Sequence, residues 1–155
     1  MPKIFALSSK LPVGIQAVSQ HPTPLLLALY SGTVSAGQSR FPSPAQDYEQ
    51  EMLDLHQHVV TNPPATFFFT VSGDSMSGAG IFDGSKLAVD RSLTPKSGQI
   101  VLAVLDGELV VKRLYKRGAV VKLLSENPAY PPIVLEEAQE CTVWGVVTYV
   151  ITSTL

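Results

Sequence analysis

The region from Ala65 onward constrains the fold most strongly, because it consists of short β-rich runs separated by turn residues. Branched and aromatic side chains gather in segments of strand length, and Gly, Pro and Asn mark the breaks. Seven segments fit this description: 66–72, 86–90, 99–105, 108–116, 119–124, 132–135 and 141–151. The Asp-Gly pair within "LDGEL", residues 105–109, suits a two-residue type I′ hairpin turn. We therefore expect a mainly β fold, a compact β domain over residues 41–155.

The first 40 residues have a different character and predict a flexible, extended N-terminal arm. Proline or glycine recurs along this segment, at Pro2, Pro12, Gly14, Pro22, Pro24, Gly32 and Gly37. Such residues interrupt regular structure, so we expect irregular backbone with a few apolar anchors, Leu25 to Leu27 among them.

Between the arm and the strands, the sequence predicts one N-terminal helix over residues 44–59. Ser43 is placed to be its N-cap, Pro44 occupies the first helical position, and Gln46 completes a capping box. Apolar side chains then follow at helical spacing, at Met52, Leu55 and Val59.

Composition narrows the class of protein. Apolar residues make up 45% of the 155 residues and charged residues 15%, enough for a substantial core. A net charge of −2 does not indicate a nucleic-acid binder, so no direct sequence-specific DNA binding is expected.

The single cysteine, Cys141, excludes an internal disulfide, and its side chain is predicted to lie in the core. The apolar run at 25–30 is too short to span a membrane, and no signal peptide is visible.

Ser75 lies in the glycine-rich stretch "FFFTVSGDSMSGAG", residues 67–80, which has two interpretations. Gly and Ser commonly form turns, so the serine could simply follow a strand. Alternatively, the loop could present Ser75 as a nucleophile. "GDSMSG" is not the nucleophile elbow of α/β hydrolases, because Ser77 replaces the second glycine. A nucleophilic serine also needs a base.

The histidines are poor candidates for that base. His21 lies in the arm, and His56 and His58 are two residues apart on the predicted helix, where they point to different faces. The same spacing makes His56 and His58 poor joint metal ligands, and we interpret them as surface residues.

Lys112 is a better candidate because of its place in the strand "ELVVKRLYKR". Side chains alternate along a strand, so Val110, Lys112 and Leu114 share one face. If that face is the core, desolvation lowers the pKa of the Lys112 amine, which could then act as a general base. If it is not, Lys112 extends to the surface along its aliphatic stem. Periodicity alone leaves both readings open.

Several motifs together resemble the LexA-type self-cleaving proteins, and among them the UmuD-like accessory subunits of error-prone translesion DNA polymerases. The resemblance covers most of the chain from about Phe41. The motifs are "FPSPAQDY" at 41–48, "SGDSM" at 72–76, "DG" at 83–84, "VD" at 89–90, "GELVVKRL" at 107–114 and "WGVV" at 144–147. The resemblance implies a LexA/UmuD-like β domain with one N-terminal helix and an N-terminal arm.

The same resemblance assigns roles to particular residues. It implies that Ser75 is the nucleophile and Lys112 the general base of a Ser/Lys dyad that hydrolyses one peptide bond in the protein's own arm. The backbone N–H groups of Asp74 and Ser75 would form the oxyanion hole. This chemistry requires no metal and no cofactor.

The family cleaves between a small residue and glycine, which favours the Ala36–Gly37 bond in the arm. Here the sequence departs from the family pattern, because "QSR" separates this glycine from "FPSPA". An ungapped comparison would instead place the cut at Ser39–Arg40. We prefer Ala36–Gly37, since a bulky charged arginine fits a narrow site poorly.

The resemblance also implies partners. It implies a bacterial cytoplasmic homodimer whose cleavage is stimulated by the RecA filament on single-stranded DNA during the SOS response. The trimmed product would bind a UmuC-like Y-family DNA polymerase. A LexA-like repressor would need a helix-turn-helix of about 60 residues before the cleavage site. Only 36 residues precede the preferred bond, so we do not expect a repressor. A non-enzymatic β domain that binds polymerase or filament with an idle dyad remains the alternative.

Overall fold

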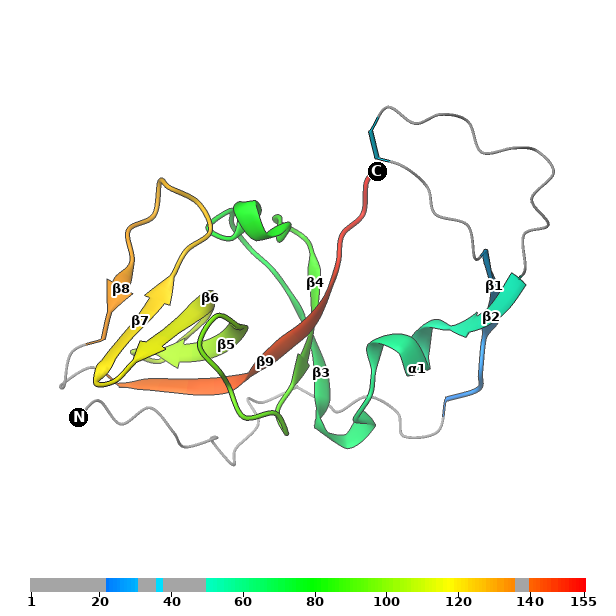
Figure 1. The fold of residues 1–155 in the computed structure, drawn as a ribbon, viewed down its shortest axis with the longest axis horizontal. Helices are drawn as coiled ribbons and strands as arrows, with labels where there is room; N and C mark the ends of the chain where they lie inside the picture. Colours follow the sequence, from blue (N-terminus) through cyan, green and yellow to red (C-terminus); the bar gives the residue numbers. More distant parts are fainter. Residues whose placement is uncertain (1–21, 31–35, 38–49, 136–139) are drawn as a thin grey trace. The chain divides into compact units, whose positions relative to one another are not determined.

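The structure, a computed structural model, describes residues 22–30, 36–37, 50–135 and 140–155. The chain divides into two units, one formed by His21–Thr61 and the other including Asn62–Leu155. Strands dominate both units, and α1 (Leu55–Val59) is the α-helix of the described residues (Figure 1). The prediction of a mainly β fold is therefore confirmed.

The unit His21–Thr61 contains a two-stranded antiparallel sheet followed by α1. Strand β1 (Leu26–Tyr30) pairs with β2 (Gln50–Asp54), and Leu26 lies opposite Asp54. The expectation of irregular backbone throughout the first 40 residues is thus wrong for β1, whose residues pair with β2.

The helix predicted over residues 44–59 is shorter than expected. Residues Gln50–Asp54 form a strand because their backbone groups pair with β1, and this long-range pairing overrides the helical spacing. The helix α1 begins only after Asp54, whose carboxylate accepts a hydrogen bond of 2.9 Å from the His56 N–H. The proposed cap residues Ser43, Pro44 and Gln46 lie outside the described residues.

The second unit is built on a seven-stranded sheet in the order β3-β4-β9-β5-β6-β7-β8, in which every pair is antiparallel. Its strands are β3 (Thr66–Thr70), β4 (Lys86–Asp90), β5 (Ile100–Leu105), β6 (Glu108–Arg117), β7 (Val120–Leu124), β8 (Ile133–Val134) and β9 (Cys141–Ile151). Two short 3-10 helices, η1 (Pro63–Ala65) and η2 (Ser77–Ala79), flank β3 and the loop after it. All seven predicted strands are present with boundaries that differ by a few residues.

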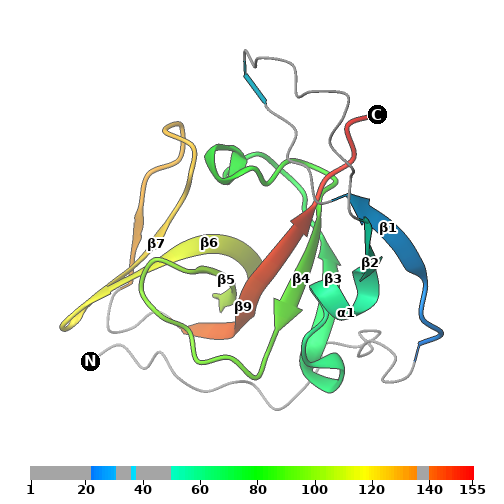
Figure 2. The same ribbon diagram turned by 45° about the vertical axis from the view of Figure 1, so that its right-hand side comes forward.

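The long strand β9 joins the two halves of this sheet. Its first half pairs with β5 and its second half with β4, and Figure 2 shows it crossing diagonally between them. Register shifts interrupt both ladders, and such bulges increase the local twist of a strand. The sheet is therefore strongly twisted around β9.

Two apolar clusters fill the interior of this unit. One lies around Val101, Leu114 and Leu123 on β5, β6 and β7, and the other around Phe67 and Trp144 on β3 and β9. The hairpin between β5 and β6 has positive φ at both turn residues, 49° at Asp106 and 88° at Gly107. This confirms the predicted type I′ character of the turn.

Candidate active site

Ser75 lies in the loop between β3 and β4, and the residues around it hold the loop in place. Met76, directly after Ser75, is only 1% exposed and packs in the cluster with Trp144. Burying a methionine side chain contributes about 1.5–3 kcal/mol. Before Ser75, the Gly73 N–H donates to the Asp83 carboxylate at 2.8 Å, and Gly73 has a φ of 94°. The loop is thus fixed on both sides of the serine hydroxyl.

Lys112 lies on β6 and belongs to the buried face of that strand. Its neighbour on this face, Leu114, is 1% exposed, and its cross-strand partner on β5 is the fully buried Val101. Lys112 itself is 9% exposed. Of the two readings that periodicity left open, burial is correct and extension to the surface is wrong. This burial lowers the pKa of the Lys112 amine, because the charged form loses hydration.

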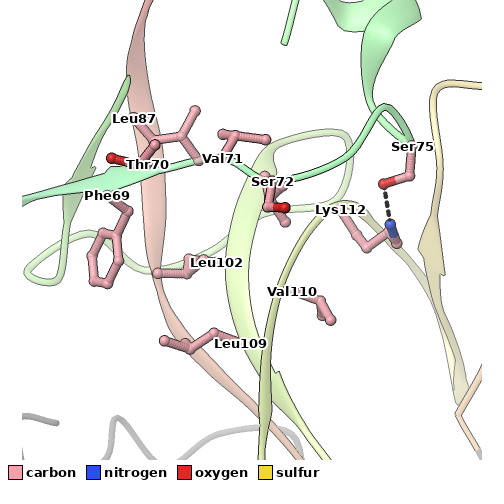
Figure 3. A pocket seen from close by; sticks show the side chains of 11 residues that line it. Phe69, Thr70, Val71, Ser72, Ser75, Leu87, Leu102, Leu109, Val110 and Lys112 are labelled. Atoms are coloured by element: carbon pink, nitrogen blue, oxygen red, sulfur yellow. Dashed lines mark hydrogen bonds between the residues drawn. The ribbon is translucent and has the colours of Figure 1, made fainter. Parts of the chain in front are cut away.

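The fold brings these two side chains into direct contact. Lys112 Nζ lies 2.5 Å from Ser75 Oγ in a hydrogen bond, drawn as the dashed line in Figure 3. The loop after β3 and the strand β6 meet although β4, β9 and β5 lie between them in the sheet order. A buried amine with a lowered pKa beside a serine hydroxyl has the geometry and the protonation tendency of a base paired with a nucleophile.

A cleft of about 300 Å³ adjoins the Ser75–Lys112 pair. One wall is formed by residues of β3 and the loop after it, and the other by the start of β6 (Figure 3). Seven of the eleven residues that line it are apolar, and the full lining is Phe69, Thr70, Val71, Ser72, Ser75, Leu87, Leu102, Leu109, Val110, Val111 and Lys112. The serine and the lysine therefore lie in a cleft that suits an extended peptide with small or apolar side chains.

The backbone around Ser75 also provides hydrogen-bond donors. Within the described part of the chain, the N–H groups of Asp74 and Ser75 have no hydrogen-bond acceptor. After Ser75, the next backbone N–H with a hydrogen-bond acceptor is that of Ser77, which donates to the Asp74 carbonyl at 3.1 Å. Two successive N–H groups at the serine are thus available as donors, which is one requirement of an oxyanion hole.

The residues predicted for the scissile bond lie in the other unit. Ala36 and Gly37 are both exposed, while Ser39 and Arg40 lie outside the described residues. The cleavage site thus remains a prediction.

Three residues that the sequence reasoning did not select also contact the Ser75 loop. They are Glu126, Asn127 and Tyr130, in the connection between β7 and β8. In the sequence this segment, "ENPAYPP", indicates only a turn, and nothing in it points to the serine.

The histidines and the cysteine that the structure describes form no further site. His56 and His58 lie on α1, and among the described residues no group of three or more His, Cys, Asp or Glu could hold a metal ion. Cys141 is buried, as predicted, and burial together with the nearby Asp106 carboxylate raises the pKa of its thiol. In the part of the chain that the structure describes, no helix has the length and apolar character needed to cross a membrane.

Comparison with known proteins identifies the family of this chain. The Peptidase S24-like family matches residues 28–148. Protein SamA of Salmonella typhimurium is 42% identical over 132 residues, which cover 85% of this chain and 89% of SamA. Protein MucA of Escherichia coli is 44% identical over 79% of this chain and 82% of MucA. The LexA repressor of Thiobacillus denitrificans is 42% identical over 67% of this chain and 54% of the repressor. The chain therefore belongs to the Peptidase S24-like family, as a UmuD-like relative of LexA.

Proposed function

We propose that this protein is a serine peptidase that cleaves its own N-terminal arm with Ser75 as nucleophile and Lys112 as general base. The observation that carries the proposal is the 2.5 Å hydrogen bond between Lys112 Nζ and Ser75 Oγ, made by an amine that is only 9% exposed. Membership of the Peptidase S24-like family supports the same chemistry.

The reaction begins when the neutral Lys112 amine accepts the proton of Ser75 as Oγ attacks the carbonyl carbon of the scissile bond. The negative charge that develops on the carbonyl oxygen is stabilised by the N–H groups of Asp74 and Ser75. The ammonium then returns its proton to the leaving nitrogen, the C–N bond breaks, and an ester to Ser75 remains. Water hydrolyses this ester with Lys112 again as base, so the serine is regenerated.

The scissile bond in this proposal is Ala36–Gly37. Ala36 carries only a methyl group and Gly37 no side chain, so both residues are small enough for the cleft beside Ser75, and their exposed position is compatible with entry into a site. Cleavage here releases residues 1–36 and leaves a product that begins at Gly37. Mass spectrometry distinguishes this product from one that begins at Arg40, the result of a cut at Ser39–Arg40.

The biological role follows from the UmuD-like relatives. We infer a homodimer in the bacterial cytoplasm that acts in SOS mutagenesis and DNA repair. Its cleavage is stimulated by RecA filaments on single-stranded DNA, and its trimmed form is the accessory subunit of a UmuC-like Y-family polymerase in translesion synthesis. The similarity to SamA, MucA and ImpA supports this role. The alternative role, a binding domain with an idle dyad, predicts the same partners but no cleavage.

The experiment that separates these two roles is incubation of the purified protein between neutral and alkaline pH. Self-cleavage should accelerate as pH rises, because a larger fraction of Lys112 is neutral. The Ser75→Ala and Lys112→Ala variants should not cut, whereas the exposed controls Ser97→Ala and Lys96→Ala should cut at the wild-type rate. The same fragment from both dyad variants would refute the proposal. Addition of RecA, single-stranded DNA and a nucleotide then tests the stimulation.

A further inference from the structure

The connection between β7 and β8 is hydrogen-bonded to the Ser75 loop on both sides of the serine. The Glu126 N–H donates to the Ser75 carbonyl at 2.9 Å, and the Gly78 N–H donates to the Glu126 carbonyl at 2.7 Å. In Figure 1 this connection arches beside the loop that follows β3. A Cβ atom at Gly78 would lie 2.4 Å from the Glu126 carbonyl oxygen, so the close approach requires glycine at this position. The two segments are therefore packed backbone against backbone.

Glu126 also links the serine loop to the strand that carries the lysine. Its carboxylate forms an ion pair with Arg113, which directly follows Lys112 on β6. Arg113 in turn donates to the Gly98 carbonyl at 2.6 Å. One residue thus connects the backbone of Ser75 with the neighbour of Lys112.

Asp74, the residue before the serine, is held by two side chains of the same connection. The Tyr130 hydroxyl donates to Asp74 Oδ1 at 2.5 Å, and this hydrogen bond raises the pKa of Tyr130. The Asn127 amide donates to the Asp74 carbonyl at 3.1 Å and to Oδ2 at 3.4 Å. The connection is itself braced, because the Ala129 N–H donates to Asn127 Oδ1 and the Tyr130 N–H to the Asn127 carbonyl, both at 3.0 Å.

We propose that Asn127 and Tyr130 are positioning residues for self-cleavage, which act on the serine through Asp74. Their hydrogen bonds fix the Asp74 carboxylate and carbonyl, and so the orientation of the Asp74–Ser75 peptide. That peptide carries both the Ser75 N–H of the oxyanion hole and the backbone from which Oγ extends toward Lys112. A small displacement of such groups lowers the rate strongly, because the reaction depends on their alignment.

Tyr130 has a second contact with the same site. Its ring lies with its centroid 6.0 Å from Lys112 Nζ, so it is close to the amine as well as to Asp74. Removal of the hydroxyl alone leaves this ring in place. The variant Tyr130→Phe therefore isolates the hydrogen bond to Asp74 from the contact with the amine.

The test measures self-cleavage of the full chain across the pH range used for the proposed function, on which this inference rests. Tyr130→Phe should lower the rate constant roughly tenfold at every pH, as expected for the loss of one hydrogen bond to a carboxylate. Asn127→Ala should also lower it. Tyr115→Phe, which removes a hydroxyl from a tyrosine on β6, is the matched control and should cut at the wild-type rate. Thermal unfolding shows whether each variant is folded at the assay temperature.

A double-mutant cycle decides whether Tyr130 acts through Asp74. In an Asp74→Ala background, Tyr130→Phe should have almost no further effect, because its acceptor is already absent. A full tenfold effect in that background would overturn the inference. The inference would also be overturned if Tyr130→Phe and Asn127→Ala both cut at the wild-type rate. If Ser75→Ala is inactive in the same assay, the proposed self-cleavage through Ser75 would still stand. If the wild-type chain shows no Ser75-dependent cut, both fail together.

Discussion

Replacement of Lys112 by methionine should stop self-cleavage and at the same time stabilise the protein. Methionine has nearly the length of lysine and suits the apolar neighbours on β6, where Leu114 is 1% exposed. The change removes an amine that is only 9% exposed and whose hydrogen-bond partner, within the described residues, is Ser75. The buried amine therefore lowers the stability of the native state, and on the proposed function its role is catalytic.

The stability gained by Lys112→Met depends on pH, and the direction of this dependence follows from the lowered pKa of Lys112. Burial lowers the pKa of Lys112 in the native state, whereas lysine in an unfolded chain titrates near 10.4. Between these two values the unfolded state binds more protons than the native state. The free energy of unfolding therefore rises with pH across this window, by at most about 1.4 kcal/mol per pH unit for one proton. The cost is fully present below the lowered native pKa and vanishes above about 10.4.

Urea unfolding at a series of pH values measures this cost. The comparison should use Ser75→Ala against Ser75→Ala/Lys112→Met, since neither protein cuts itself and all other titrating groups cancel. The double variant should be more stable at neutral pH, and its advantage should shrink as pH rises toward 10. Lys96→Met, which removes the charge of an exposed lysine, is the matched control and should not reproduce the advantage of the double variant. An advantage of Lys112→Met that is absent, or constant with pH, would show that the native amine carries no penalty, and the neutral-base argument would fail.

Three further predictions follow from other contacts, each measured in the Ser75→Ala background so that the chain stays intact. Gly78→Ala should lower the free energy of unfolding by about 1–3 kcal/mol, because its Cβ would lie 2.4 Å from the Glu126 carbonyl oxygen. Gly118→Ala, where the added Cβ meets nothing within 4 Å but φ is 59°, should cost about 1–2 kcal/mol from backbone strain alone. A change below about 0.5 kcal/mol at Gly78, the size of an ordinary surface substitution, would argue against the clash. Trp144→Ala should cost about 3–5 kcal/mol, since Trp144 is 1% exposed and packs edge to face with Phe67 and Phe69 at 5.2 and 5.0 Å; a loss below 1 kcal/mol in urea unfolding would contradict this packing. Cys141 should resist iodoacetamide in the native protein and react in urea, because burial raises the pKa of its thiol and covers it; rapid labelling of the folded chain would show that the strand start is open.

The strands of the second unit could be predicted because local composition and long-range pairing agree there. Branched and aromatic runs ended at turn residues, and the Asp-Gly hairpin needed only the positive φ values that Asp106 and Gly107 adopt. The alternation along β6 correctly grouped Lys112 with Leu114. Alternation could not decide whether that face is buried, because burial depends on β5 and β7, which pair with β6 from both sides.

The helix from 44 to 59 was overestimated because local signals compete with distant partners. Met52 and Leu55 have helical spacing, yet Met52 pairs with Ala28 in the β1–β2 sheet and only Leu55 belongs to α1. The spacing of apolar residues within 44–59 cannot indicate that part of this segment pairs with a distant strand, β1. The roles of Asn127 and Tyr130 were invisible for the same reason, since their partner Asp74 lies more than 50 residues earlier.

The meeting of Ser75 and Lys112 shows where control of the proposed cleavage must lie. The serine loop follows β3 at one edge of the sheet, and the lysine lies on the fifth strand in the sheet order, so only the curled sheet brings them to 2.5 Å. Their hydrogen bond is already formed in the folded protein, and Met76 and the bonds to Glu126 hold the loop in that place. On the proposed mechanism, the contact between base and nucleophile is therefore in place before the substrate peptide enters. On the proposed mechanism, we therefore expect an activating filament to act on the delivery of the Ala36–Gly37 bond to the cleft.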